Sequence, residues 1–255
     1  TYQTERHNGI PGLLEVLGGI ITGFALPVKE EHKKYLRTVL LPMHKVPCLA
    51  MIHPQLSYCV TQFVDKDHTL AVPVVRGLLR YWPRQNSGKE VLLLSELEEV
   101  LELTRPDEFE QLLLPLCRQL ARCIGSMHFQ TAQRTLFLWH NEYVASMLAN
   151  FRAEVFPVLY PALQSSIEHW NQPVADLASN VLNIFVDLEP ELVKMCAEGH
   201  SVDAKRADER GGQRREKWRA LLARDRGMRE TGEKGPICDD DKALDLGPAK
   251  HDKHN

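Results

Sequence analysis

The first 45 residues contain two successive runs of apolar positions with helical spacing. The first run recurs at steps of three and four residues, which is typical of a helix with one buried side. Its members are Leu13, Val16, Leu17, Ile20, Ile21 and Phe24. Gly23 and Pro27 end this run, and a charged stretch from Lys29 to Lys34 begins a second run through Leu36 and Met43. The sequence therefore predicts a helical hairpin over 8–45 with charged residues at its turn.

Similar apolar runs follow one another as far as about residue 188 and thin from residue 189. Prolines fall among large apolar residues at positions 42, 73, 115 and 157, with spacings of 31, 42 and 42 residues. No segment shows sustained period-two alternation, so no strand is predicted. Paired helices with a period near 40 indicate an all-α fold, a HEAT-like or armadillo-type solenoid over 1–200.

Several helices within this array have specific predicted features. Pro106 suits a helix start, and Asn171 suits an N-cap with Pro173 in the first turn. One long apolar helix with an internal proline is predicted over 141–169. Another helix carries the core positions Leu93, Leu97 and Val100. On the outer face of that helix we expect Glu96, Glu98, Glu99 and Glu102.

Charge is distributed unevenly along the chain. Residues 1–200 hold 17 Lys and Arg against 22 Asp and Glu, whereas 201–230 hold 10 against 6 and 231–255 hold 4 against 6. Residues 201–230 are predicted as a basic charged helix or extension, interrupted by Gly211 and Gly212, and 231–255 as a disordered tail. A solvated helix, a nuclear-localisation patch and a partner-binding patch all remain open for 201–230. The acidic body argues against nucleic-acid binding by 1–200.

The sequence offers little catalytic chemistry. It contains no CxxC pair, HExxH, GxSxG, P-loop or GxGxxG pattern, so we predict neither a cofactor nor a metal. The six cysteines are expected to be buried reduced thiols, as in cytoplasmic or nuclear proteins. No apolar run approaches the ~20 residues of a membrane span. These features favour a binding protein over an enzyme.

Many short segments together resemble the B-prime regulatory subunits of protein phosphatase 2A. They include the stretches at 8–10, 13–17, 20–21, 23–27 and 29–33, and those at 53–56, 58–60, 62–63, 66–67, 78–83, 89–91, 96–99, 128–130, 139 and 141–143. The resemblance runs from Thr1 to about Leu188. It implies stacked HEAT-like repeats, of which this chain is expected to be the C-terminal part, because it begins at Thr1 in mid-pattern.

The resemblance also implies a role as a non-catalytic subunit. Such subunits dock on the phosphatase scaffold (A) and catalytic (C) subunits and recruit substrates that carry a Leu-x-x-Ile-x-Glu motif. In the family this motif lies in a concave groove between two repeats. The matching positions here are Glu15, Val16, Ile20, Lys29 and His32. Val16 replaces an isoleucine that is common in the family. An aromatic residue, a histidine and arginines of the family's pocket belong to a repeat before Thr1, so weak motif binding is expected.

Other interpretations remain open. Val16 and Ile20 are also at core spacing, and Lys29 and His32 suit a solvated helix start. A generic α-solenoid adaptor of another complex and an all-α hydrolase with an unrecognised site are alternative functions. The sequence does not specify the substrates, the isoform or the role of 201–255.

Overall fold

A computed structural model describes the backbone of residues 9–231 and the side chains of these residues except 204, 207 and 224–231. The described residues form helices and connecting turns, with no strand among them. The α-helices are α1 (Ile10–Thr22), α2 (Glu30–Tyr35), α3 (Leu41–Met43), α4 (His53–Lys66), α5 (Ala71–Arg80), α6 (Ser87–Glu102), α7 (Pro106–Ile124), α8 (Phe129–Leu136), α9 (Glu142–Asn150), α10 (Arg152–Ser166), α11 (Gln172–Leu188) and α12 (Pro190–Thr231). A π-helical turn, η1 (Leu36–Leu40), and three 3-10 turns, η2 (Leu49–Met51), η3 (His68–Leu70) and η4 (Phe137–His140), complete the set. The predicted all-α fold class is confirmed.

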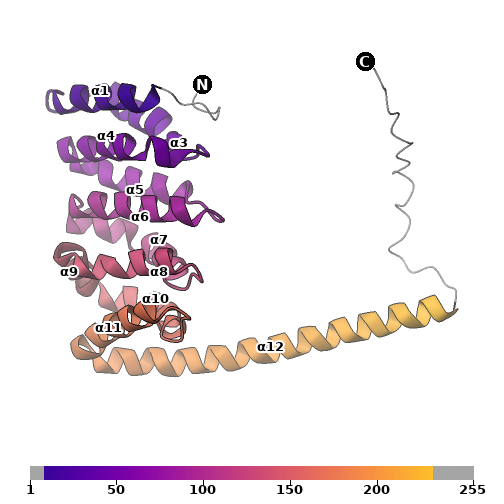
Figure 1. Cartoon of the computed structure of the whole chain (residues 1–255). Helices are drawn as coiled ribbons and strands as arrows, with labels where there is room; N and C mark the ends of the chain where they lie inside the picture. Colours follow the sequence, from indigo (N-terminus) through magenta and orange to yellow (C-terminus); the bar gives the residue numbers. More distant parts are fainter. Residues whose placement is uncertain (1–8, 232–255) are drawn as a thin grey trace, which may run out of the picture. The chain divides into compact units, whose positions relative to one another are not determined.

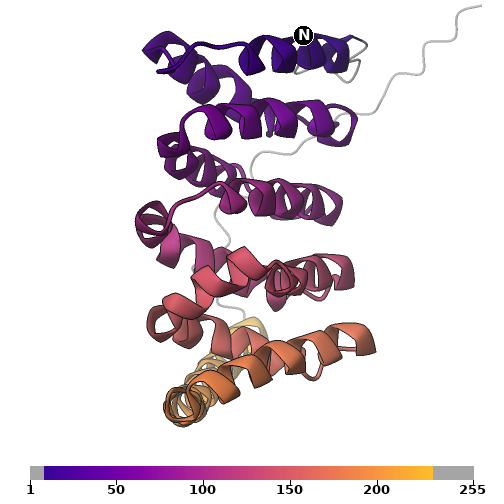
Figure 2. The same ribbon diagram turned by 90° about the vertical axis from the view of Figure 1, so that its left-hand side faces the viewer.

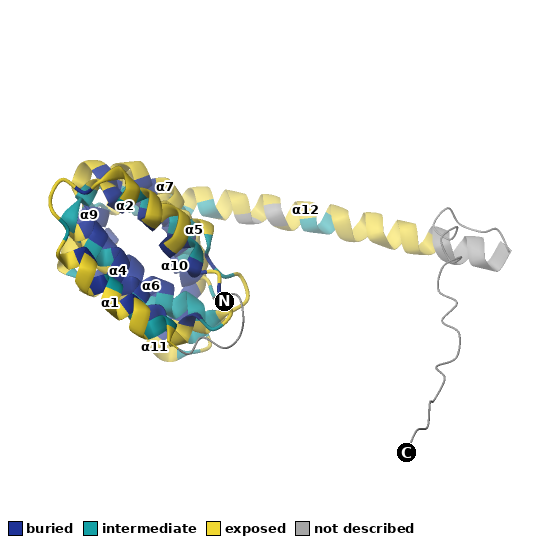
Figure 3. Ribbon diagram, turned by 90° about the horizontal axis from the view of Figure 1, so that it is seen from above, coloured by how far each residue is buried: buried dark blue, intermediate teal, exposed yellow. Residues whose placement is uncertain are grey.

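The helices stack in two layers. In one layer α1 packs on α4, α4 on α6, α6 on α8, and α8 on α11 (Figure 1). In the other layer α3 packs on α5, α5 on α7, and α7 on α10, and Figure 2 shows successive pairs rising through the stack. Buried residues lie between the two layers and exposed residues lie outside, as Figure 3 shows. Each buried Leu or Phe stabilises this interior by roughly 1.5–3 kcal/mol.

Local sequence signals set many of the helix ends. The Asn86 side chain accepts a hydrogen bond from the Lys89 N–H at 3.0 Å, which caps α6. Pro106 begins α7, and Asn171 precedes α11, as predicted. Pro42 lacks an N–H and would crowd the preceding turn of a regular helix. The wider η1 turn precedes it, with the Leu41 N–H bonded to the Leu36 carbonyl.

Two predicted helix boundaries need correction. The single helix expected over 141–169 is two helices, α9 and α10, separated at Phe151. Phe151 has non-helical dihedral angles, and its ring stacks on Phe109 of α7 with centroids 6.0 Å apart. The break between the two helices therefore lies at a residue that packs on a distant helix, and no Gly or Pro marks it in the sequence. Conversely, α12 continues through Gly211 and Gly212, where an interruption was expected.

The chain divides into two units, one ending at Glu198 and the other beginning at Gly199. Leu192, in the first turn of α12, is buried in the first unit. The described side chains of α12 beyond Gly199 are mostly exposed. The predicted disordered tail lies outside the described residues, apart from Thr231. No helix among residues 9–231 is long and apolar enough to cross a membrane.

Candidate peptide-binding face

The predicted buried stripe of α1 is exposed over much of its length. The side chains of Leu13, Val16 and Ile20 are 71%, 62% and 54% exposed. At about 100° per residue these three share one side of α1, which we name the α1 face. Of the predicted stripe, Ile21 is buried, as is the neighbouring Leu14, whereas Leu17 and Phe24 are half-buried. The apolar residues therefore share one side of α1 as predicted, but only the edge that contains Ile21 lies in the core.

Close packing of α1 on α4 explains which side is covered. At Gly18 a Cβ atom would lie only 2.7 Å from the Tyr58 ring, so glycine allows the two helices to approach. The Cys59 thiol donates a hydrogen bond to the Leu14 carbonyl at 3.1 Å. These contacts fix the rotation of α1 and turn the α1 face away from α4.

The turn after α1 is held by aromatic rings. The His32 ring stacks on Phe24 with centroids 4.0 Å apart and planes 14° apart. Phe24 in turn meets the Phe63 ring of α4 edge-on, at 5.8 Å. His32 Nδ1 is buried and has no hydrogen-bond partner within residues 9–231. The Phe24 ring therefore holds the His32 imidazole by stacking, and this contact involves no hydrogen bond of Nδ1.

Neighbouring lysines at the start of α2 have different environments. Lys33 pairs with Asp67 at 2.8 Å and with Glu30 at 3.2 Å, which ties α2 to the end of α4. These hydrogen bonds raise the pKa of Lys33 above 10.5. Burial disfavours the Asp67 carboxylate, but Lys33 and Thr69 outweigh it, and the pKa of Asp67 lies below 3.8. Lys29 is exposed and forms no ion pair within the described part of the chain.

The predicted site residues thus fall into two groups. Glu15, Val16 and Ile20 are exposed on α1, whereas Lys29 and His32 lie at the start of α2. Phe24 connects the groups by following α1 and stacking on His32. The exposed Val16 and Ile20, the exposed Lys29 ammonium and the stacked His32 imidazole suit a peptide with an aliphatic anchor and a carboxylate.

A family model described as protein phosphatase 2A regulatory B subunit (B56 family) matches residues 1–224. The chain belongs to the B56 family. It is 52% identical over 221 residues to the Arabidopsis thaliana B' eta isoform of the 59 kDa regulatory subunit, and 47% identical to the human and rabbit delta isoforms of the 56 kDa regulatory subunit. Each alignment covers 86% of this chain and 37–43% of the relative, so the chain spans less than half the length of these proteins. The predicted family and its helical-repeat fold are confirmed.

Sequence reasoning missed a buried polar cluster in this B56 chain. Glu96 was expected on the outer face of its helix, but its side chain is fully buried. It accepts hydrogen bonds from His44 Nε2 at 2.9 Å and from His53 Nε2 at 3.0 Å. Helical spacing predicts this burial, although glutamate is a polar residue type. Glu96 lies three residues after Leu93 and four before Val100, and both are core residues.

His44 is the charged partner of Glu96. Its Nδ1 lies 2.9 Å from the Leu41 carbonyl oxygen, so both ring nitrogens face acceptors and the ring donates from each. Burial opposes the charged imidazole, but the Glu96 carboxylate outweighs burial and raises the pKa of His44 above 6.5. Burial likewise opposes the Glu96 carboxylate, yet His44 and His53 lower the pKa of Glu96 to about 2. The cluster joins the end of α3 and the start of α4 to α6.

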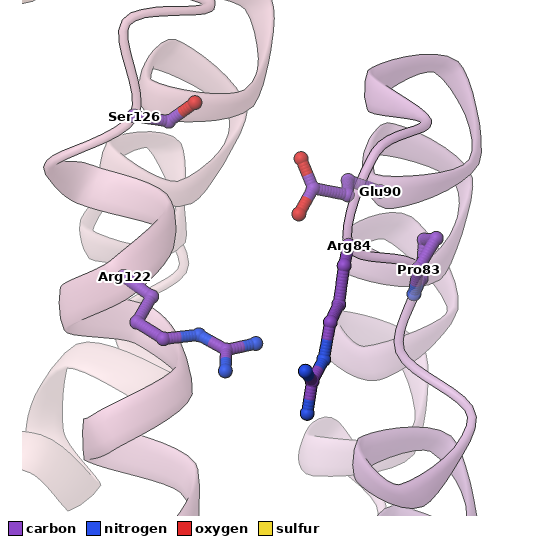
Figure 4. A pocket seen from close by; sticks show the side chains of 5 residues that line it. All are labelled: Pro83, Arg84, Glu90, Arg122 and Ser126. Atoms are coloured by element: carbon purple, nitrogen blue, oxygen red, sulfur yellow. The ribbon is translucent and has the colours of Figure 1, made fainter. Parts of the chain in front are cut away.

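Two pockets in the B56 repeats are lined by arginines. One, of about 470 Å³, lies where α5 leads into α6 and where α7 ends. Figure 4 shows Arg122 reaching from α7 toward this space, Arg84 on the opposite wall, and the Glu90 carboxylate pointing inward. Glu90 also accepts hydrogen bonds from Trp82 and Thr131, each at 3.3 Å. This pocket therefore contains both basic and acidic side chains. The second pocket, beside η1 and α5, is lined by arginines without any acidic residue.

Proposed function

We propose that this chain acts as a non-catalytic regulatory subunit that recruits substrates to protein phosphatase 2A. Substrate segments of the form Leu-x-x-Ile-x-Glu bind along the α1 face. Val16 and Ile20 contact an aliphatic side chain of the segment, Lys29 pairs with its glutamate, and His32 adds a hydrogen bond. Glu15, exposed beside Val16, faces the peptide backbone.

The observation that carries this proposal is the exposure of Val16 and Ile20, one helical turn apart on α1. Removing apolar side-chain surface from water is favourable by about 25 cal/mol per Å², so a partner that covers Val16 and Ile20 gains affinity. Lys29 forms no ion pair with any residue of 9–231, so its ammonium can meet an incoming carboxylate. Such charge-assisted hydrogen bonds contribute about 1.5–3 kcal/mol.

The test is a fluorescence anisotropy titration of a labelled Leu-x-x-Ile-x-Glu peptide against the full chain. Lys29→Glu replaces attraction by repulsion and should weaken binding about tenfold or more. Ile20→Ala removes apolar contact and should weaken binding by about tenfold.

Matched controls separate this site from general effects. Lys34→Glu makes the same charge change on the same helix at another exposed position. Ile184→Ala truncates an isoleucine that is 42% exposed on α11. Both should bind the peptide as the unchanged chain does. Equal losses in Lys29→Glu and Lys34→Glu would contradict the proposed carboxylate contact.

The same role requires docking on the phosphatase scaffold and catalytic subunits. Affinity purification of the tagged chain from cells should retrieve both subunits, whereas a general solenoid adaptor would retrieve neither. Phosphatase activity in the purified chain alone would favour the hydrolase alternative. We place this role in the cytoplasm or nucleus, where free thiols such as the five described cysteines are usual.

A further inference from the structure

A groove of about 340 Å³ lies between η1 with α3 on one side and α5 on the other. Arg37, Arg76 and Arg80 line it, and Leu41, Val72 and Pro73 provide its apolar surface. We name it the arginine groove. It is formed by elements other than α1, and nothing proposed for the α1 face involves it.

The described part of the chain does not neutralise the arginines of this groove. Arg37, Arg76 and Arg80 are exposed and form no ion pair or hydrogen bond with any residue that the structure describes. Arg76 and Arg80 are one helical turn apart on α5, a spacing at which like charges repel. Lys45 adds a fourth cation, with its ammonium 4.7 Å from the centroid of the Tyr81 ring.

A close helix contact brings these charges together. A Cβ atom at Gly77 would lie 2.8 Å from Leu41 Cδ1, so the glycine lets α5 approach α3 closely. Arg37, one turn before Leu41, and Arg76, next to Gly77, therefore line the same groove. Concentrated like charge is unfavourable in the free protein, and an anion that binds there removes this repulsion.

We propose that the arginine groove binds a short acidic segment of a partner protein. Aspartate or glutamate side chains pair with Arg37, Arg76 and Arg80, and an aliphatic neighbour packs on Leu41 and Val72. Guanidinium groups suit this task because they hold carboxylates with two parallel hydrogen bonds.

The charge of the surrounding protein favours a short segment over an extended polyanion. Residues 1–200 carry 17 Lys and Arg against 22 Asp and Glu, so the groove is a local basic site on an acidic body. A nucleic acid or an anionic membrane would also meet the acidic surroundings. A peptide of a few residues meets only the groove, within about one Debye length of ~8 Å.

The test uses the full chain and a fluorescein-labelled peptide containing one leucine followed by a run of glutamates. Binding should be detectable by anisotropy and should weaken as salt rises from about 0.05 M to about 0.3 M. The double variant Arg37→Glu with Arg76→Glu should raise the dissociation constant by about tenfold or more. Arg37→Gln with Arg76→Gln should act in the same direction, and circular dichroism should show both variants folded, since these side chains are exposed.

The matched control is Arg84→Glu with Arg122→Glu, the same charge change in the pocket of Figure 4, where Glu90 already lies. The dissociation constant of this control for the acidic peptide should lie within about twofold of that of the unchanged chain. This change is much smaller than the roughly tenfold change expected when close charge pairs in the groove are lost. Equal losses in both double variants would overturn the proposal, because net charge alone would then explain binding. Tighter binding to single-stranded DNA or to phosphatidylserine vesicles than to the peptide would overturn it as well.

Discussion

Replacing Glu96 by alanine should strongly destabilise the packing of α3 and α4 against α6. Glu96 is fully buried and is the shared acceptor of His44 and His53, which lie 52 and 43 residues away in the chain. Alanine leaves the buried His44 cation with only its bond to the Leu41 carbonyl. Removing one partner of a buried ion pair generally costs about 3–5 kcal/mol, because the remaining charge is left without compensation.

The pKa of Glu96 gives a second measure of the same interaction. A change from 4.5 to about 2 corresponds to about 3–4 kcal/mol at roughly 1.4 kcal/mol per pKa unit. The raised pKa of His44 reflects the same ion pair, so the two contributions are not added. For a folded unit of this size each 1 kcal/mol of lost stability lowers the melting temperature by about 2–4 °C, so Glu96→Ala should lower it by about 6–16 °C.

Thermal melts followed by circular dichroism at several pH values are the assay. The lowered pKa of Glu96 stabilises the fold above pH 4.5, and this contribution is lost as pH falls toward about 2. The raised pKa of His44 stabilises the fold fully below pH 6.5, and this contribution is lost as pH rises through the folded value. The difference between the unchanged chain and Glu96→Ala should therefore be largest between about pH 4.5 and 6.5.

Two further variants test whether the buried charges of Glu96 and His44 cause the loss of stability. Glu99→Ala, on the same helix, removes an exposed carboxylate that accepts one bond from Ser57 at 2.9 Å, and should lower the melting temperature far less. The double variant His44→Phe with Glu96→Leu replaces the charges by apolar groups and should recover much of the loss. A drop in Glu96→Ala no larger than that in Glu99→Ala would refute a charged buried cluster.

Two more measurements test other parts of the structure. Iodoacetamide should modify the half-buried Cys48 and Cys196 well before the buried Cys59, Cys117 and Cys123, as peptide mass spectrometry would show. Burial raises the pKa of these three to about 11, 12 and 11, which lowers the reactive thiolate about 100-fold or more, so equal rates would contradict the burial. Gly211→Ala with Gly212→Ala should slow amide hydrogen exchange around 205–220 by up to about 30-fold, since alanine favours a helix by about 1 kcal/mol per residue. Unchanged exchange would mean that α12 does not continue through these glycines.

The helices, many of their ends and the family follow from the sequence. Apolar spacing, proline at helix starts and capping asparagines are local signals that do not depend on distant contacts. Pro106 and Asn86 mark helix starts for this reason. The site residues came from the family resemblance, and spacing alone left Val16 and Ile20 equally suited to the core.

Tertiary structure decides which face of each helix is covered. Periodicity shows which residues share a side of α1, but the packing of α4 on α1, with Tyr58 against Gly18, leaves Leu14 buried and Ile20 exposed. The burial of Glu96 likewise depends on histidines more than 40 residues away. The arginine groove forms where Gly77 of α5 packs closely on Leu41 of α3. Local sequence determines the helices, whereas burial, ion pairing and surface charge depend on residues that only folding brings together.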